Sequence, residues 1–174
     1  MKRLLCTAAC IFAVLHAFAE ERSFTSPDGK IMVTVNDNDG KPTYSVSYDG
    51  EEFILPSPLG LNTSLGEYVA DMTLLPEKDA PKLIEEEYSV RTIKQSKVNY
   101  KATEAVFTFA KEDRPAFDVI FRVSDRDVAF RYKVYPKRDT RSAVVYSEAT
   151  GFQLSKGSTS FLCPQVKPGG ACAS

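Results

Sequence analysis

The 174-residue chain carries 22 lysines and arginines against 23 aspartates and glutamates, and its net charge of −1 leaves no basic footprint for nucleic acid or an anionic membrane. Its only histidine, His16, lies in a leader that we expect to be removed, which excludes catalytic triads, Cys–His nucleophiles and histidine-based zinc sites. Carboxylates, lysines and tyrosines remain for acid–base chemistry such as glycoside hydrolysis, although every protein contains them.

Residues 1–19 have the three parts of a secretory signal peptide. Lys2 and Arg3 give a positive start, residues 4–15 form an apolar run, and residues 17–19 (Ala-Phe-Ala) are a small-x-small cleavage site. The apolar run is too short for a membrane span, and no cysteine directly follows the cleavage site to carry a lipid. We therefore expect an exported, soluble protein, periplasmic or extracellular, whose mature chain has 20 basic and 23 acidic residues.

The mature chain has about 155 residues, which suits one domain with a substantial core. Alternation of apolar and polar side chains over its first part predicts three short strands joined by two polar turns. The strands and turns of this meander are expected, in chain order, at residues 30–35, 37–40, 43–48, 49–50 and 52–55.

A proline-rich corner at residues 56–61 follows the meander, because proline lacks the amide hydrogen that a central strand needs. The alternation fades over residues 66–81, which we read as a loop or an edge strand. Further strands are predicted at residues 88–94 and 104–109, and a polar loop at 111–114 leads into the most regular part of the chain.

That most regular part is residues 117–135, in which two alternating strands flank the polar residues 124–127. A strand turns successive side chains to opposite faces, so the pattern predicts a β-hairpin. A shift of register by one residue would place aromatic side chains against charged ones, so a single pairing is specified. The expected pairs are Val123–Val128, Phe121–Phe130, Val119–Tyr132 and Phe117–Val134 on an apolar face, with Asp118–Lys133 and Arg122–Ala129 on the other.

Shorter strands are predicted at residues 144–146, 151–154 and 160–162, and no window has the period of a helix. Many short strands separated by turns are typical of a sandwich or a barrel. Cys163 and Cys172 lie beyond these strands, where an oxidising compartment permits a disulfide but nothing in the sequence sets its geometry. The sequence therefore predicts an all-β fold.

Two clusters of charged residues could be interpreted as binding sites. For both clusters, the interpretation as ordinary solvated surface charge is stronger. Arg122, Arg126 and Arg131 would suit an anion or a sugar, but charges on the outer face of a hairpin are usually solvated. Three adjacent glutamates, Glu85–Glu87, alternate faces on a strand and cannot converge on a cation. We interpret them as a solvated edge that resists aggregation.

A third group resembles part of a calcium-binding loop. Asp37, Asp39 and Gly40 have the spacing of such a loop, yet the first and last ligand positions are occupied by Val35 and Val46. Valine offers no oxygen ligand from its side chain, so we interpret the segment as a plain turn.

Seven motifs follow one another in a fixed order along the chain. The longest is VIFRVSDRDVAFRY at residues 119–132, and the others are FTSPDG (24–29), YSVSYDG (44–50), PSPLGL (56–61), NYKATEAVFTF (99–109), EATGF (148–152) and FLCPQ (161–165). They span nearly all of the mature chain, and several ordered motifs together are specific. In this order they resemble the N-terminal domain of glycoside hydrolase family 97.

The resemblance implies an antiparallel β-sandwich of the β-super-sandwich type, followed in the family by a catalytic (β/α)8 barrel and a small C-terminal β domain. It implies full enzymes that act on α-glucosides or α-galactosides with Ca²⁺ at the active site. The family's catalytic glutamates lie in the barrel, and its N-terminal domain lends a calcium-binding glutamate a little beyond the Cys-Pro-Gln segment. Residues 166–174 hold no match to that ligand, and Glu148 lies too early to replace it. We therefore assign no catalytic, cofactor-binding or metal-binding residue to this chain, and expect Ca²⁺ only in a full-length family member.

The expected organisation is a signal peptide at residues 1–19, a family 97 N-terminal-like β-sandwich at 20–165 and a divergent or truncated tail at 166–174. On this hypothesis the chain is a fragment that supports a catalytic barrel in cis and is inactive alone. Its expected partners are that barrel and, through the full enzyme, an oligo- or polysaccharide substrate, with no nucleic acid and no membrane. The alternative hypothesis is a free-standing exported β-sandwich module that binds a glycan or a protein.

Overall fold

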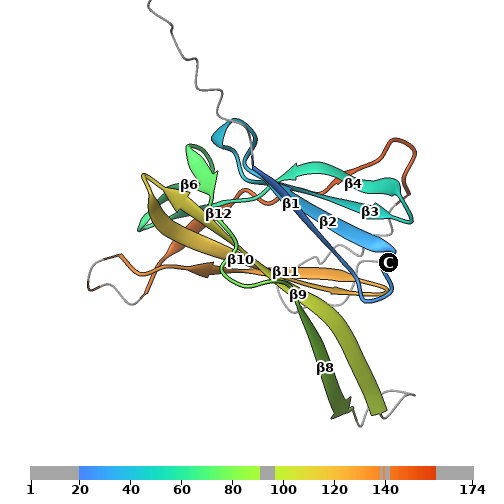
Figure 1. The fold of residues 1–174 in the computed structure, drawn as a ribbon. Helices are drawn as coiled ribbons and strands as arrows, with labels where there is room; N and C mark the ends of the chain where they lie inside the picture. The colour runs from blue at the N-terminus through green and yellow to red at the C-terminus, as the bar shows by residue number, and fades with distance from the viewer. Residues whose placement is uncertain (1–19, 91–96, 138, 140–141, 160–174) are drawn as a thin grey trace, which may run out of the picture.

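The computed structural model describes residues 20–90, 97–137, 139 and 142–159, which form two large antiparallel sheets and one small sheet (Figure 1). The two large sheets lie face to face with one hydrophobic core between them, so the predicted all-β sandwich is confirmed. The predicted signal peptide, the predicted strand at 160–162 and both tail cysteines lie outside the described residues.

The first sheet contains the predicted meander. Its strand order is β1-β2-β3-β4-β13, with bounds Glu21–Thr25, Ile31–Asn36, Thr43–Tyr48, Glu51–Pro58 and Gln153–Leu154. β4 runs into the segment that was expected to be a proline corner. It can do so because the pairing of β3 with β4 shifts register between Tyr44 and Val46, and the irregularity accommodates Pro56 without a ladder hydrogen bond.

The second sheet contains the predicted hairpin. Its strand order is β11-β10-β9-β7, and β8 also pairs with β9; the bounds are Met72–Leu74 for β7, Lys82–Ser89 for β8, Lys97–Lys111 for β9, Arg114–Ser124 for β10 and Val128–Val134 for β11. All six predicted cross-strand pairs are present in the register of β10 and β11. The strand expected at 88–94 is in fact displaced toward the N-terminus, because Lys82–Ser89 pairs along its whole length with β9.

The third, small sheet closes one end of the sandwich. It has the order β12-β5-β6, with bounds Val145–Glu148, Leu61–Thr63 and Gly66–Tyr68. A 3-10 turn, η1 (Asn38–Gly40), follows β2. The carboxylate of Asp37 beside it accepts hydrogen bonds from the amides of Glu20 and Leu74, each at 2.9 Å, and so joins β1 and β7 to this turn.

The core is built from the inward-facing residues of β2 and β3 on one side and of β9 and β10 on the other. Phe121 is fully buried at its centre, with its ring centroid 5.1 to 6.0 Å from those of four other aromatic residues. These four are Phe24, Tyr44, Phe107 and Phe130. Aromatic side chains therefore supply much of the area buried between the sheets.

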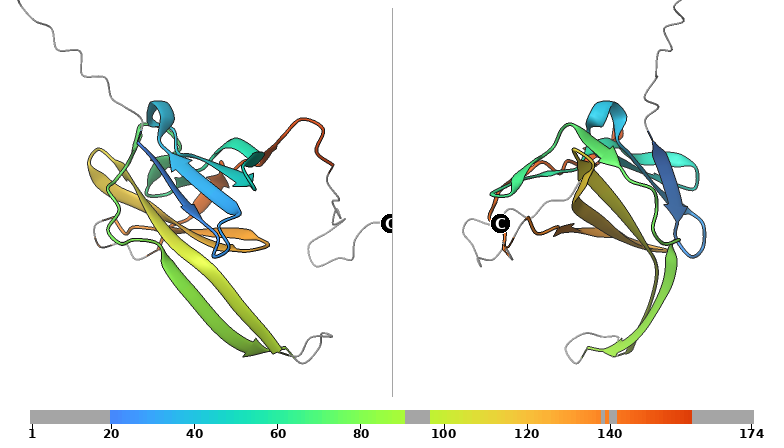
Figure 2. Two further views of the ribbon diagram at one scale, coloured as in Figure 1. Left: turned by 45° about the vertical axis from the view of Figure 1, so that its right-hand side comes forward. Right: turned by 60° about the vertical axis from the view of Figure 1, so that its left-hand side comes forward.

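A two-stranded arm, formed by β8 and the first residues of β9, projects from the sandwich (Figure 2). Most side chains of β8 are exposed, including those of Leu83 and Tyr88. The glutamates alternate faces as predicted: Glu85 and Glu87 pair with lysines of β9, whereas Glu86 pairs with Arg122. Among the described strands, β8 pairs with β9 alone, so the glutamates lie on a solvated edge.

One residue of the hairpin differs from its expected environment. Asp118 faces away from the core, but only 3% of it is exposed. Its carboxylate accepts hydrogen bonds from Thr108 Oγ1 at 2.8 Å and Tyr135 OH at 3.0 Å, and Lys133 Nζ lies 3.7 Å away. Neighbouring side chains cover this carboxylate and compensate for its loss of water.

Candidate functional surface at residues 144–154

The stretch of chain at residues 144–154 combines exposed apolar side chains with a polar network beneath them. It runs along β5 and β4, with Ala149 N bonded to Gly60 O and Gly151 N to Pro58 O, each at 3.0 Å. Tyr146 is 66% and Phe152 64% exposed, and Val144 and Val145 are exposed as well. We call Val144, Val145, Tyr146 and Phe152 the C-terminal surface.

The network beneath it is centred on Tyr132 of β11. The Gly60 amide donates a hydrogen bond to Tyr132 OH at 3.1 Å, and Tyr132 OH lies 2.7 Å from Thr150 Oγ1. Thr150 donates its own proton to Glu148 Oε1 at 2.6 Å, so Tyr132 is the donor to Thr150. The resulting relay runs from Tyr132 through Thr150 to Glu148 and holds residues 148–150 in one conformation.

Tyr44 ties the same stretch to the core. Its hydroxyl donates to Gly151 O at 3.0 Å, and its ring lies 5.4 Å from that of Phe130 and 6.4 Å from that of Phe152. Burial, with a smaller contribution from Tyr132, raises the pKa of Tyr44 to about 12. Burial is also the main reason why the pKa of Tyr132 is raised; its hydrogen bonds with Thr150 and Gly60 oppose this, whereas the charge of Glu148 adds to it.

This raised pKa predicts a loss of stability in alkali. The ordinary tyrosine pKa is 10.0, so between that value and about 12 the unfolded state has released the Tyr44 proton while the folded state still holds it. The contribution of Tyr44 is complete below pH 10.0 and is lost as the pH rises through about 12. We expect the free energy of unfolding in urea to fall from about pH 10 to about pH 12, and to fall less steeply in Tyr44→Phe. Equal slopes in the two proteins would contradict this assignment.

The chemistry available at this surface is positioning and binding. Glu148 is the only carboxylate of the relay, whereas glycoside hydrolysis needs a pair of carboxyl groups on either side of the bond that breaks. Across the residues that the structure describes, no three His, Cys, Asp or Glu side chains are grouped to hold a metal ion, so these residues do not fit a calcium site. The position at which the family's calcium ligand was expected lies beyond them.

The three arginines considered from sequence do not form a common site. Arg122 is engaged by Glu104 Oε2 at 2.7 Å and Glu86 Oε1 at 3.2 Å, and the hydrogen bond to Glu104 is the main reason why its pKa is raised. Arg126 and Arg131 are exposed, in the hairpin turn and on β11. The partner Glu104 was missed, although it lies directly opposite Arg122 once β9 and β10 are aligned.

The Tyr132–Thr150–Glu148 relay was also missed by sequence reasoning. The motif EATGF marked residues 148–152 as a recognisable segment, but no local pattern connects it with Tyr132.

In the described part of the chain, no helix is long and apolar enough to cross a bilayer.

Comparison with known proteins matches this architecture to a protein family. The family model described as "Glycosyl-hydrolase 97 N-terminal" matches residues 24–171. A probable retaining α-galactosidase of Streptomyces bingchenggensis (strain BCW-1) is 28% identical over 163 residues, which are 89% of this chain and 24% of that protein.

Solved structures agree with this match. A β-arabinopyranosidase is 38% identical with a TM-score of 0.76, over 84% of this chain and 23% of that one. A glycoside hydrolase family 97 enzyme from Pseudoalteromonas sp. strain K8, in complex with panose, is 22% identical with a TM-score of 0.69, over 78% of this chain and 20% of that one. The chain thus spans about a quarter of the length of these relatives. The family match over most of its residues shows that the chain belongs to the glycosyl-hydrolase 97 N-terminal domain family.

Proposed function

We propose that this chain is the non-catalytic N-terminal domain of an exported glycoside hydrolase, and that it supports a (β/α)8 catalytic barrel through the C-terminal surface. The observation that carries this proposal is the exposure of Tyr146 and Phe152 on a stretch of backbone that a partly buried hydrogen-bond network holds in place. Aromatic residues are enriched in the cores of protein interfaces. A stretch that is already ordered loses little conformational entropy on docking.

The domain's relatives support such a partner. Family 97 N-terminal domains accompany a catalytic domain in full-length enzymes with glycan substrates. The matched region covers only 24% of the Streptomyces α-galactosidase, so the rest of that protein is long enough to contain a catalytic domain. Ca²⁺ would belong to the active site of the complete enzyme, and export would follow from the signal peptide expected at residues 1–19.

Of the two substrate classes expected from sequence, we propose α-galactosides over α-glucosides, although the family 97 enzyme at 22% identity was solved with panose, an α-glucosyl trisaccharide. One relative is named for α-galactosides and another, at 38% identity, for β-arabinopyranosides. In the common L form, β-arabinopyranose has the configuration of α-D-galactopyranose at every ring carbon and differs by lacking the exocyclic hydroxymethyl group. A catalytic site shaped for this ring would accept either sugar.

The test compares the chain alone with a polypeptide in which it precedes a catalytic domain of the family. We expect the chain alone to release no p-nitrophenol from its α-galactoside or α-glucoside, because the catalytic glutamates expected for this family lie in the barrel. In the longer polypeptide we expect α-galactoside hydrolysis, and Tyr146→Ser to lower the melting temperature and the activity. Tyr48→Ser is the matched control, since Tyr48 is 52% exposed at the far end of β3.

Three outcomes would contradict this proposal. Hydrolysis by the chain alone that scales with protein concentration would show that it is catalytic. Equal effects of Tyr146→Ser and Tyr48→Ser would remove the docking role of the C-terminal surface. A fully active catalytic domain with no affinity for this chain would favour the alternative, a free-standing exported module that binds a glycan or a protein.

A further inference from the structure

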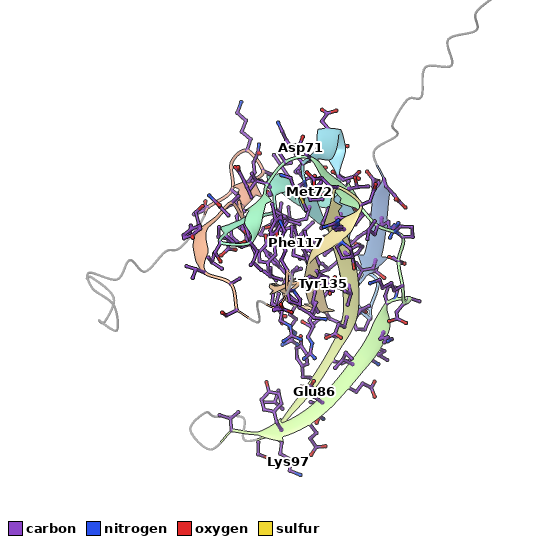
Figure 3. The ribbon with its side chains drawn as sticks, turned by 90° about the vertical axis from the view of Figure 1, so that its left-hand side faces the viewer. Asp71, Met72, Glu86, Lys97, Phe117 and Tyr135 are labelled. Atoms are coloured by element: carbon purple, nitrogen blue, oxygen red, sulfur yellow. The ribbon has the colours of Figure 1, made fainter. Side chains whose placement is uncertain are left out.

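A hollow of about 380 Å³ lies where β6, the β9–β10 turn and the end of β11 meet. Tyr135, labelled in Figure 3, stands in its wall, where Asp118 accepts a hydrogen bond from its hydroxyl at 3.0 Å. The volume lies within the range of small-molecule sites in proteins. We call it the basic hollow; its charged lining residues are Glu67, Lys111, Glu112, Arg114 and Lys137.

Three cations line this hollow: Lys111 and Arg114 flank the β9–β10 turn, and Lys137 follows β11. Lys111 is held in place because its ammonium group donates to Glu67 O at 2.9 Å and to Ala70 O at 3.2 Å, which leaves one N–H for a ligand. Lys137 reaches Leu65 O at 3.4 Å, and Arg114 is exposed at the rim. Within the described residues, none of the three forms an ion pair with a carboxylate.

The backbone at the rim places two of these cations against each other. Lys111 and Arg114 are direct cross-strand partners, and like charges in that position repel. The turn that joins them has positive φ at both central residues, 52° at Glu112 and 61° at Asp113. Such turns favour Asn-Gly, so an acidic pair there is strained. A bound anion would compensate for the repulsion between the two cations.

The same lining also offers hydrogen-bond acceptors. Glu67 and Glu112 line the hollow and, within the described residues, form no ion pair with a cation. A simple inorganic anion would be repelled by these carboxylates. A ligand that carries both a carboxylate and hydroxyl groups uses the cations and the carboxylates together.

We propose that the basic hollow binds a sugar acid, such as a hexuronate, at the end of a glycan. The sugar carboxylate lies between Arg114 and the free N–H of Lys111, where a guanidinium pairs with a carboxylate through two parallel hydrogen bonds. The sugar hydroxyls donate to Glu67 and Glu112. The site needs no catalytic partner, so this proposal is tested independently of the proposed docking of a barrel.

The test is a titration of the chain, monitored by NMR amide shifts and by calorimetry, with D-galacturonate and D-glucuronate. D-Galactose and D-glucose are the neutral controls, and inorganic sulfate at the same ionic strength is the control for a simple anion. We expect saturable uronate binding that shifts the amides around the hollow and weakens as salt is added. Arg114→Gln should weaken it by about tenfold or more, as loss of a charge-assisted contact does.

Arg126→Gln, which removes an exposed arginine from the hairpin turn, is the matched control and should leave uronate affinity unchanged. Lys137→Gln should weaken binding less than Arg114→Gln, because its ammonium lies only at the edge of the proposed contacts. The proposal is overturned if neutral sugars bind as tightly as uronates, if sulfate alone binds as tightly, or if Arg114→Gln has no effect. Circular dichroism of each variant establishes that it is folded before the comparison is made.

Discussion

Replacing Phe121 with Asp is expected to unfold the domain. Phe121 is fully buried, and its ring contacts aromatic rings from both large sheets. Loss of a buried phenylalanine costs about 3–5 kcal/mol by itself. An unpaired buried carboxylate adds a desolvation penalty, and the total is comparable to the whole stability of a domain, about 5–15 kcal/mol. Circular dichroism and thermal melting should show no cooperative transition.

Arg126→Ala in the turn of the same hairpin is the control for this experiment. The side chain of Arg126 is exposed, and its backbone amide, which bonds to Ser124 Oγ, is kept in the variant. The expected loss is about 0.5 kcal/mol or less. Similar melting temperatures for Phe121→Asp and Arg126→Ala would mean that the faces of the hairpin are assigned wrongly.

Gly60→Ala is expected to destabilise the domain strongly although it adds one methyl group. Gly60 has φ 146°, and a Cβ there would lie 2.5 Å from Tyr68 O and 3.2 Å from Val69 Cα. Both are backbone atoms, so relief of the contact requires β5 and β6 to separate. The Gly60 amide also bonds to Tyr132 OH, so its displacement disturbs the relay beneath the C-terminal surface. We expect a loss of about 3 kcal/mol, measured by urea unfolding.

Gly50→Ala separates this steric effect from the general cost of placing alanine at a glycine position. Gly50 also has positive φ, 85°, but a Cβ there meets nothing within 4 Å. The expected loss is about 1 kcal/mol, which reflects backbone conformation alone. If Gly60→Ala cost no more than Gly50→Ala, close packing between Gly60 and β6 would not be a determinant of stability.

Within the fold, local patterns determined most of what could be predicted. Alternation and a four-residue turn were enough to predict six of the seven cross-strand pairs of β10 and β11, because period-two burial allows only one register. The meander of β2, β3 and β4 followed in the same way from alternation and turn residues. Where alternation faded, over residues 66–81, the sequence predicted only a loop or an edge strand, and β6 and β7 do lie at the edges of their sheets. The start of β8 was not predicted, because its side chains are mostly exposed and polar.

The candidate sites depend on contacts between residues far apart in the chain. Tyr132 and Thr150 are joined across an edge of the sandwich, and Lys111 meets the backbone of residues 67 and 70 across more than forty positions. No local pattern encodes such a contact, because it arises only after two sheets pack in a particular alignment. The family motifs marked residue 148 and its neighbours but not their partners.

By itself, the sequence determined the fold class, the hairpin register and the family resemblance, since these depend on periodicity and on ordered local motifs. Only the tertiary structure decided that Asp118 is buried beneath Tyr135, that Arg122 is engaged by Glu104 and Glu86, and that Lys111 and Arg114 line one hollow. The physical reason is that alternation assigns a side chain to a face of a sheet. What covers that face, and therefore whether a charge is solvated, paired or left available for a ligand, depends on elements that packing brings together.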